Sequence, residues 1–375
     1  MQDTDMLPRD TAVQLVDAHG AVVEDDRYDL PGADALRTAY RGLVEARRIN
    51  DQASALVRQG RLAVYPSSHG QEACQVAAAL ALGSEDWLFP TYRDSVAVIA
   101  RGVAPAEAMV LLQGDWHSGY DVRQHRVAPQ ATPLATQLLH AVGFAYAARQ
   151  RGEDTVVMAL CGDGATSEGD FHEALNFAAV FRVPVVFFVQ NNGFAISVPL
   201  SRQTAAPSIA HKAIGYGMPG QRVDGNDVAA VLAVLGEAVA RARGGGGPSL
   251  VEAHTYRMQA HTNADDDSRY RERSEVQAWA ARDPLARLRA HLRASGALTD
   301  SLEEEYAAGA EEIASAMRSA LSVDADVDPE DLFRFVTETR SPLLEEQWRM
   351  LHGEIERARQ DDPAPAAHDA LGGPR

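Results

Sequence analysis

The sequence predicts an α/β fold, a parallel sheet flanked by helices, with an extended arm before it and a helical extension after it. Two short apolar runs, residues 155–161 and 184–189, are continuous rather than alternating, which is typical of strands buried on both faces. The segment between them carries apolar residues at helical spacing. A strand, a helix and a second strand in this order form the repeating unit of a parallel sheet.

The chain of 375 residues is long enough for one large α/β domain. We expect residues 1–32 to form an extended arm, because their apolar residues are scattered among acids before Pro31-Gly32. Residues 361–375 begin with acids and prolines and predict a disordered tail. Residues 33–360 should form the α/β domain with its helical extensions, beginning with a helix that places on one face Leu36, Tyr40, Leu43 and Val44.

The remaining elements follow from spacing and from glycine positions. Helical spacing predicts one helix face made of Leu134, Leu138, Ala141, Val142, Ala145 and Ala148. It predicts a second one made of Phe171, Ala174, Leu175 and Ala178. A helix over 228–242 should stop at the glycine run 244–247, before a strand over 249–257. Beyond Tyr270 the chain becomes charged and helical.

Composition excludes several classes of protein. The formal net charge of -18 disfavours nonspecific binding to nucleic acids or to anionic membranes. The longest apolar stretch, near 73–82, is too short to span a bilayer, and the N-terminus lacks the features of a signal peptide. The two cysteines, Cys74 and Cys161, form no paired motif and fit a reducing compartment. We therefore expect the bacterial cytoplasm.

The segment most informative about chemistry is Gly162-Asp163-Gly164, at the end of the first predicted strand. Asn192 follows Asp163 by 29 residues, just past the next strand. Because parallel strands end at the same edge of a sheet, Asp163 and Asn192 should converge there. A carboxylate, an amide oxygen and a backbone carbonyl near Phe194 would suit Mg²⁺ together with two phosphate oxygens. The two glycines and the following helix N-terminus would let phosphates approach.

Two other interpretations of this segment compete. A dinucleotide-binding fingerprint requires glycine where Ser167 stands, and the carboxylate of Asp163 would repel a bare pyrophosphate. The glycines could also form ordinary turns with Asp163 as a helix cap. The strand, the helix and the second polar segment at the matching spacing favour the metal and phosphate site.

Gly-Asp-Gly, about thirty residues and then Asn-Asn is similar to the motif of thiamine-diphosphate enzymes. Over about residues 30–355 the chain more narrowly resembles the α subunits of 2-oxoacid dehydrogenase E1 components, and so implies a thiamine-diphosphate-binding fold. The segments that carry this resemblance are 70–73 (Gly-Gln-Glu-Ala), 89–93 (Phe-Pro-Thr-Tyr-Arg), 132–137 (Thr-Pro-Leu-Ala-Thr-Gln) and 261–266 (His-Thr-Asn-Ala-Asp-Asp).

The resemblance implies a set of cofactor contacts. Tyr92 and Arg93 would contact the diphosphate, and Thr132 and Leu134 would lie beside the cofactor rings. His261 would bind cofactor and act in catalysis, as an imidazole that handles protons near neutral pH. In some relatives Pro133, Thr136 and Gln137 also help to hold a structural K⁺. The remaining cofactor residues would be Gly162, Asp163, Gly164, Ala165, Asn192 and Phe194, with Mg²⁺ on Asp163, Asn192 and Phe194.

Two positions depart from the family pattern. Gln190 stands where some relatives place an arginine that could touch the diphosphate, which puts that contact in doubt. Ala260 precedes His261 where others carry a second histidine, so this loop offers one imidazole.

The family also implies the reaction and the partners. Thiamine diphosphate supplies the electron sink for decarboxylation, and a glutamate that activates it comes from a separate β subunit. We therefore expect an α2β2 heterotetramer that passes the acyl group to a lipoyl-bearing E2 acyltransferase. The segment 132–137 and the acidic loop after His261 favour branched-chain 2-oxo acids, derived from valine, leucine and isoleucine, over pyruvate.

Three other classes of protein fit less well. A self-sufficient thiamine decarboxylase would need two cofactor-binding domains, which 375 residues hardly hold. A nicotinamide-dependent enzyme is disfavoured by Asp163 and Ser167, and a non-catalytic scaffold by the presence of Asp163, Asn192 and His261 together.

Overall fold

The computed structural model describes residues 6–114, 119–322 and 328–361. It divides into two compact units, Met1–Val323 and Asp324–Arg375. The second unit holds α12 (Asp331–Arg334) and α13 (Pro342–Asp361). Most of the tail predicted to be disordered, residues 362–375, lies outside the described residues. No helix in the described ranges is long and apolar enough to cross a membrane.

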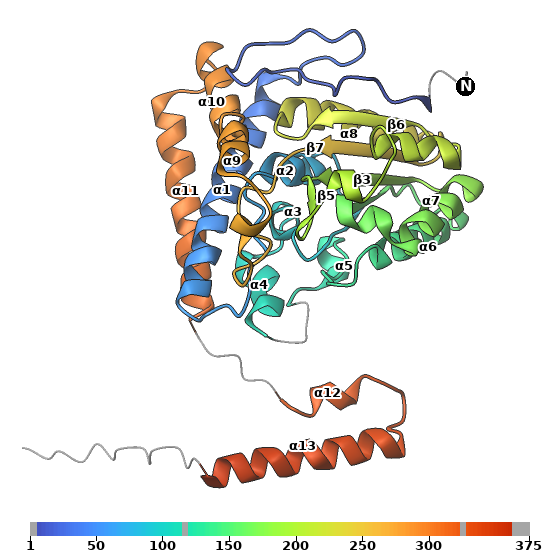
Figure 1. Cartoon of the computed structure of the whole chain (residues 1–375), viewed down its shortest axis with the longest axis vertical. Coiled ribbons are helices and arrows are strands. Elements are labelled where there is room, and N and C mark those ends of the chain that lie inside the picture. Colours follow the sequence, from blue (N-terminus) through green and yellow to red (C-terminus); the bar gives the residue numbers. More distant parts are fainter. Residues whose placement is uncertain (1–5, 115–118, 323–327, 362–375) are drawn as a thin grey trace, which may run out of the picture. The chain divides into compact units, whose positions relative to one another are not determined.

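The first unit is built on a five-stranded parallel sheet, as the sequence predicts (Figure 1). Strand β2 lies beside β3, with Gly162 opposite Gln190, so both strands end at the same edge. The strands in spatial order are β1 (Trp87–Phe89), β2 (Val157–Gly162), β3 (Val185–Asn191), β7 (Ser249–His254) and β6 (Gly220–Asp224).

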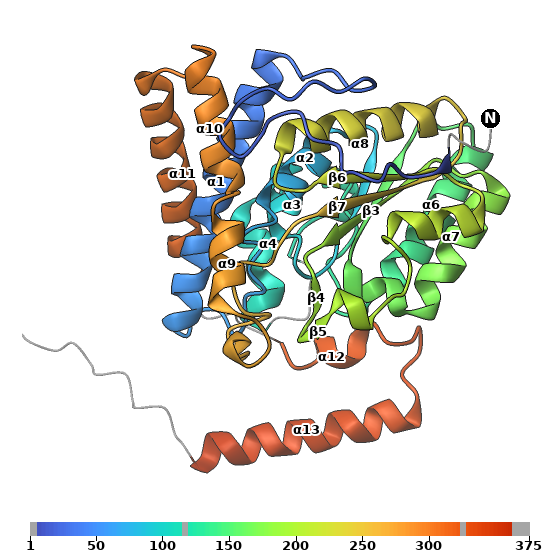
Figure 2. The same cartoon turned by 45° about the horizontal axis from the view of Figure 1, so that its top comes forward.

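Helices cover both faces of the sheet (Figure 2). The helices of this unit are α1 (Ala33–Arg58), α2 (Glu72–Leu80), α3 (Ser95–Ala100), α4 (Pro105–Gln113), α5 (Val122–His125), α6 (Thr136–Gln150), α7 (Gly169–Phe181), α8 (Val228–Arg243), α9 (Arg273–Ala280), α10 (Pro284–Ala294) and α11 (Asp300–Ala320). Short 3₁₀ segments are η2 (Asp163–Ser167), η3 (Leu200–Arg202), η4 (Ala210–Tyr216) and η5 (Asp267–Arg269), and a small hairpin joins β4 (Phe194–Ala195) to β5 (Val198–Pro199).

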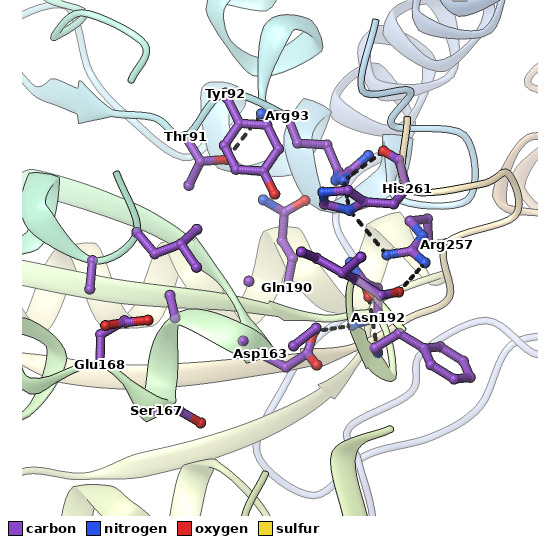
Figure 3. Close-up of a pocket in the computed structure, with 18 of the residues that line it drawn as sticks. Thr91, Tyr92, Arg93, Asp163, Ser167, Glu168, Gln190, Asn192, Arg257 and His261 are labelled. Carbon is purple, nitrogen blue, oxygen red and sulfur yellow. Dashed lines mark hydrogen bonds between the residues drawn. The ribbon is translucent and has the colours of Figure 1, made fainter. Parts of the chain in front are cut away.

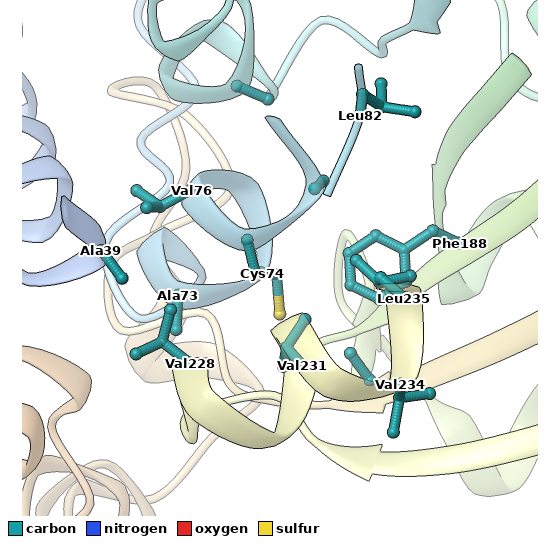
Figure 4. Packing of buried hydrophobic residues seen from close by; sticks show 14 of the residues in the cluster. Ala39, Ala73, Cys74, Val76, Leu82, Phe188, Val228, Val231, Val234 and Leu235 are labelled. Carbon is teal, nitrogen blue, oxygen red and sulfur yellow. The ribbon is translucent and has the colours of Figure 1, made fainter. Parts of the chain in front are cut away.

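The apolar runs of β2 and β3 are continuous because each face meets a different core. Met158 and Phe188 point into a cluster shared with α2 and α8, where Cys74 and Val231 also lie (Figure 4). Their neighbours along the strands point into a second cluster beneath α6 and α7, which includes Ala159. All seven residues of β3 are buried. Burial on both faces is what a parallel sheet covered by helices requires.

A helical layer stands beside the sheet. Helix α1 packs along α11 and α10, and the three lie side by side in both views (Figures 1 and 2). The apolar face predicted for α1 is confirmed, since Leu36, Tyr40 and Leu43 are buried. Arg47 of α1 forms an ion pair with Glu72, the first residue of α2, at 2.7 Å, which ties this helical layer to the start of α2.

Neighbouring segments pair with both edges of the sheet. On the β6 side, the Val13 amide donates to the Arg222 carbonyl at 2.9 Å, and the Asp224 amide donates to the Val13 carbonyl at 2.9 Å. On the β1 side, the Ala128 amide donates to the Leu88 carbonyl at 2.8 Å. Part of the segment predicted as an extended arm is therefore paired along β6.

The structure corrects three element boundaries. Leu134 is not part of the helix face predicted for it, because α6 begins at Thr136 after Ala135 turns at φ 63°. The 3₁₀ segment η2 lies between Gly162 and α7, so no α-helix starts directly at the glycines. Strand β7 ends at His254 rather than at residue 257, and the chain then turns toward the site.

Candidate active site

A cavity lies at the carboxyl edge of the sheet, where β2 and β3 end (Figure 3). Three polar segments meet there: the turn after β1, the turn after β2 and the turn after β3. The predicted site residues that line this cavity are Tyr92, Arg93, Leu134, Gly162, Asp163, Gly164, Ala165, Asn192, Phe194 and His261. Thr132 is exposed and is not among the lining residues, although its neighbours Ala131 and Pro133 are.

Asp163 and Asn192 lie next to each other at the ends of the neighbouring strands β2 and β3 (Figure 3). The Asn192 backbone amide donates to Oδ1 of Asp163 at 3.3 Å, and Gln203 Nε2 donates to Oδ2 at 2.8 Å. Oδ1 of Asn192 accepts from the Phe194 amide at 3.2 Å. The pairing of β2 with β3 thus brings the carboxylate of Asp163 against the backbone of Asn192, which is 29 residues away in the sequence, and both residues line the cavity.

The residues present fit a divalent cation. Asp163 is 1% exposed, and burial raises the pKa of its carboxyl group, although the hydrogen bond from Gln203 and the charge of Arg257 act in the opposite direction. A bound cation would offset the free-energy cost of burying this carboxylate in its ionised form. The described residues contain no cluster of three or more His, Cys, Asp or Glu side chains suited to a metal. One carboxylate plus neutral oxygens is the kind of set that Mg²⁺ uses when phosphates complete its shell.

The glycines of this turn have different roles. A Cβ on Gly164 would lie 2.8 Å from the Cβ of Ala195, so this position has no room for a side chain. A Cβ on Gly162 would meet no atom within 4 Å. Since Gly162 lines the cavity, its missing side chain leaves space for a ligand next to the backbone.

Arg93 and His261 form the opposite wall (Figure 3). Arg93 is 6% exposed, and its guanidinium donates to the Ser67 carbonyl at 3.0 Å and to the His261 carbonyl at 3.1 Å. The Arg93 guanidinium also lies over the ring of Tyr92, 5.5 Å from its centroid. These contacts hold a fixed positive charge at the cavity wall, as recognition of a phosphate requires.

The imidazole of His261 is held neutral. Burial, together with the charges of Arg93 and Arg257, lowers the pKa of His261 to about 4. Its Nδ1 lies 3.0 Å from Arg93 Nη2 and 3.4 Å from Arg257 Nη1. A guanidinium can only donate, so Nδ1 accepts and the ring proton sits on Nε2. His261 can therefore offer an N–H donor to a ligand.

A sequence model of the Dehydrogenase E1 component family matches residues 41–325 of this chain. The chain belongs to this family. The resemblance stated from the motifs is thus confirmed. The E1 family implies dependence on thiamine diphosphate, and its α subunits pair with a β subunit and an E2 lipoyl component.

Curated relatives span most of the chain. The 3-methyl-2-oxobutanoate dehydrogenase subunit alpha of Mycobacterium tuberculosis is 50% identical over 92% of this chain and 94% of its own length. The 2-oxoisovalerate dehydrogenase subunit alpha of Bacillus subtilis is 41% identical over 71% of this chain and 84% of its own. The pyruvate dehydrogenase E1 component subunit alpha of Staphylococcus aureus is 39% identical over 78% of this chain and 80% of its own.

Sequence reasoning about this E1 chain did not assign several residues of the cavity wall to the site, among them Arg257, Gln203 and Gln71. Arg257 is 1% exposed and donates to the Ile196 carbonyl at 2.7 Å and to the Tyr270 hydroxyl at 2.8 Å. Gln203 contacts Asp163, and Gln71 contacts the amide of Asn192. Arg257 could have been suspected, because it follows a strand that ends at the same edge. Gln71 lies in the segment 70–73 that carries the family resemblance, whereas Gln203 carries no comparable signal.

The loop that carries His261 is tied down through its acidic residues. The His261 backbone amide donates to Oδ2 of Asp265 at 2.8 Å, and the Tyr270 hydroxyl donates to the same oxygen. Asp265 thereby connects His261 to Tyr270, and the Tyr270 hydroxyl continues the connection to Arg257. The predicted polar loop is thus held in place by partly buried hydrogen bonds.

Proposed function

We propose that this chain is the α subunit of a 2-oxo acid dehydrogenase that decarboxylates branched-chain 2-oxo acids and passes the acyl group to a lipoyl-bearing E2 acyltransferase. The observation that carries the proposal is the 50% identity to the mycobacterial subunit over 92% of this chain. Thiamine diphosphate, when bound, would supply the electron sink for loss of carbon dioxide. The pyruvate relative, at 39% identity, makes pyruvate the alternative substrate.

The proposal assigns a binding function to each wall of the cavity. Arg93, Tyr92 and the Nε2–H of His261 would bind the diphosphate from one side. Asp163, the amide oxygen of Asn192 and the backbone carbonyl of Phe194 would hold Mg²⁺ from the other. The backbone around Gly162, Gly164 and Ala165 would approach the phosphates, and Leu134, which is 42% exposed at the cavity, would lie against the cofactor rings with Thr132 beside it.

A structural K⁺ near Pro133, Thr136 and Gln137 is a secondary part of the proposal. Gln137 is buried, and its amide nitrogen donates to the Leu160 carbonyl at 2.8 Å, which turns its oxygen away from that carbonyl. Melting of the protein in KCl and in NaCl at equal ionic strength tests this site. Equal Tm values in the two salts would remove K⁺ from the proposal.

The β subunit is proposed to cover an apolar surface on α6 and α7. Tyr146, Phe177, Val180 and Phe181 are 40%, 46%, 67% and 41% exposed. The rings of Phe177 and Phe181 are stacked, with centroids 5.9 Å apart. Contiguous exposed apolar surface of this kind marks a protein interface. We propose an α2β2 heterotetramer, with the glutamate that activates the cofactor supplied by the partner.

The test is a substrate panel on the chain co-expressed with a β subunit. We expect kcat/KM for 3-methyl-2-oxobutanoate to exceed that for pyruvate, and we expect this chain alone to be inactive. A preference for pyruvate would overturn the substrate, and equal activity without the β subunit would overturn the heterotetramer. Calorimetry with thiamine diphosphate and Mg²⁺ tests the cofactor independently of turnover.

We also propose the cytoplasm as the location of the enzyme. Cys74 and Cys161 are both free and buried, and burial raises the pKa of each thiol. Free thiols fit a reducing compartment.

A further inference from the structure

Four buried polar side chains form a continuous line along one wall of the cavity, from Asp94 before α3 to Asn192 after β3. Their exposed fractions are 1% for Asp94, 2% for both Gln190 and Gln71, and 5% for Asn192. We propose that this line, the amide relay, determines which end of the Asn192 amide faces the metal position. The proposal rests on the proposed function, because it concerns how the same site binds its cation.

The relay is continuous in hydrogen bonds. Gln190 Nε2 donates to Oδ1 of Asp94 at 2.7 Å. Gln71 Nε2 donates to Oε1 of Gln190 at 3.1 Å. Asn192 Nδ2 donates to Oε1 of Gln71 at 3.0 Å. Every step therefore runs in the same direction, from an amide nitrogen to the preceding oxygen.

The direction is imposed by Asp94. A carboxylate accepts hydrogen bonds and cannot donate them, so Gln190 must turn its nitrogen toward Asp94. The oxygen of Gln190 then faces Gln71 and accepts from its amide nitrogen. The oxygen of Gln71 in turn accepts from the amide nitrogen of Asn192. The oxygen of Asn192 is left on the side of the Phe194 amide, from which it accepts at 3.2 Å.

Asp94 is itself held by donors alone. Its Oδ2 accepts from the Thr91 amide at 2.7 Å and from the Thr91 hydroxyl at 2.8 Å. Although burial raises the pKa of this carboxyl group, each of these contacts and that of Gln190 needs an acceptor, so the ionised form fits the site. Asp94 also anchors the turn that carries Tyr92 and Arg93. The relay thus couples the arginine wall of the cavity to its metal-facing wall.

A side branch holds Gln190 in the same orientation. Gln75 Nε2 lies 3.4 Å from Oε1 of Gln190 and 3.2 Å from the Arg93 carbonyl. If the Gln190 amide were reversed, its nitrogen would face the amide nitrogens of Gln71 and Gln75, and its oxygen would face the carboxylate of Asp94. A reversed Asn192 would set its nitrogen against the Phe194 amide and its oxygen against that of Gln71. In a buried site such mismatches leave donors and acceptors unpaired.

The relay gives a reason for glutamine at position 190, where some relatives place an arginine. Gln190 has no role on the diphosphate in this assignment. It passes the orientation set by Asp94 to the ligand side chain Asn192. Hydrogen-bonded partners that orient metal ligands typically change metal affinity by about 10–100-fold when replaced.

The test breaks one step of the relay and then rebuilds a hydrogen bond at that step. Gln190→Glu sets two carboxylates against each other and removes the donor to Asp94. The repulsion should displace the carboxylate introduced at position 190 from both Asp94 and Gln71. Adding Asp94→Asn supplies a donor to that carboxylate, and its other oxygen can again accept from Gln71, so the double variant should keep the orientation of Gln71 and Asn192. Gln71→Met, which is nearly isosteric, breaks the relay next to Asn192 without adding charge. The matched control is Asn226→Asp, because Asn226 is a buried amide that contacts Thr255 and Arg282 outside the cavity lining.

Mg²⁺ is titrated by calorimetry into the full chain co-expressed with a β subunit, with thiamine diphosphate in excess. The Tm of each metal-free protein is measured in parallel. We expect Gln190→Glu and Gln71→Met to raise the Kd for Mg²⁺ by about tenfold or more. The double variant should return to within about threefold of wild type, and Asn226→Asp should leave the Kd unchanged.

Each outcome bears on the relay. An unchanged Kd in Gln190→Glu or Gln71→Met would overturn it, and so would a double variant that binds as weakly as Gln190→Glu alone. If Gln190→Glu does not fold, Gln71→Met and the double variant still decide the question. A wild-type complex that binds neither thiamine diphosphate nor Mg²⁺ would instead refute the proposed function, which separates the two failures.

Discussion

The neutral imidazole of His261 makes a prediction about pH that can be worked through from the structure. Its pKa is lowered from 6.5 to about 4, mainly by burial and then by Arg93 and Arg257, while Asp265 acts in the opposite direction. At pH 7 the ring is neutral in both the folded and the unfolded chain. As the pH falls through 6.5, His261 becomes protonated in the unfolded chain but stays neutral in the folded chain. The folded state therefore loses stability down to about pH 4, below which the loss is complete.

The size of this loss follows from the shift. A fall from 6.5 to about 4 would correspond to about 3 kcal/mol for a fully buried group. His261 is only half-buried, so solvent screening reduces the expected loss to about 1–2 kcal/mol. For a chain of 375 residues this amounts to a difference of about 1–3 °C in Tm.

The assay compares wild type with His261→Asn between pH 7.5 and 4.5 at equal protein concentration. The Asn oxygen occupies the place of Nδ1 and still accepts from Arg93, but it does not titrate. We expect the Tm of wild type to fall further than that of the variant on acidification. Saturating thiamine diphosphate should shrink the difference, because an anion near Nε2 favours the protonated ring. Parallel Tm curves for the two proteins would refute this account of His261.

Three further predictions concern the cavity and the apolar surface. Asp163→Asn should weaken Mg²⁺ binding by at least about tenfold in calorimetry, yet leave the metal-free Tm equal or higher, since it removes a buried charge; a large drop in that Tm would contradict the account. Gly164→Ala should destabilise the chain by about 1–3 kcal/mol in chemical unfolding, because its Cβ would meet that of Ala195 at 2.8 Å. Gly162→Ala should instead weaken cofactor binding with little loss of stability, because a Cβ there meets no atom of the chain within 4 Å. Phe181→Glu should abolish co-purification with a β subunit while the Tm of this chain stays unchanged, and retained assembly would exclude this surface as the interface.

The sequence was sufficient to predict the sheet and to place Asp163 near Asn192. Continuous apolar runs report burial on both faces, and parallel pairing of adjacent strands then fixes where their ends meet. Asp163 and Asn192 could be placed together for this reason, because each directly follows a buried strand. The resemblance added Tyr92, Arg93 and His261, which line the same cavity but follow no common local pattern.

Other features depend on contacts that no local pattern encodes. Leu134 fits the helical spacing of the residues after it, yet the left-handed turn at Ala135 separates it from α6 and leaves it at the cavity. Gln203 reaches Asp163 across 40 residues, and Gln71 reaches Asn192 across 121. No local pattern distinguishes Gln203 from other polar residues, and the segment 70–73 indicates a family resemblance but not which side chain Gln71 contacts.

The pairing of outer segments along β6 and β1 has a consequence for assembly. An unpaired edge strand is a template on which a foreign strand can continue the ladder, and Val13 and Ala128 already take up backbone positions on the two rims of this sheet. A partner chain should therefore recognise this one by the shape and chemistry of its side chains rather than by extending its sheet. That arrangement favours selective pairing with a dedicated subunit over open-ended polymerisation.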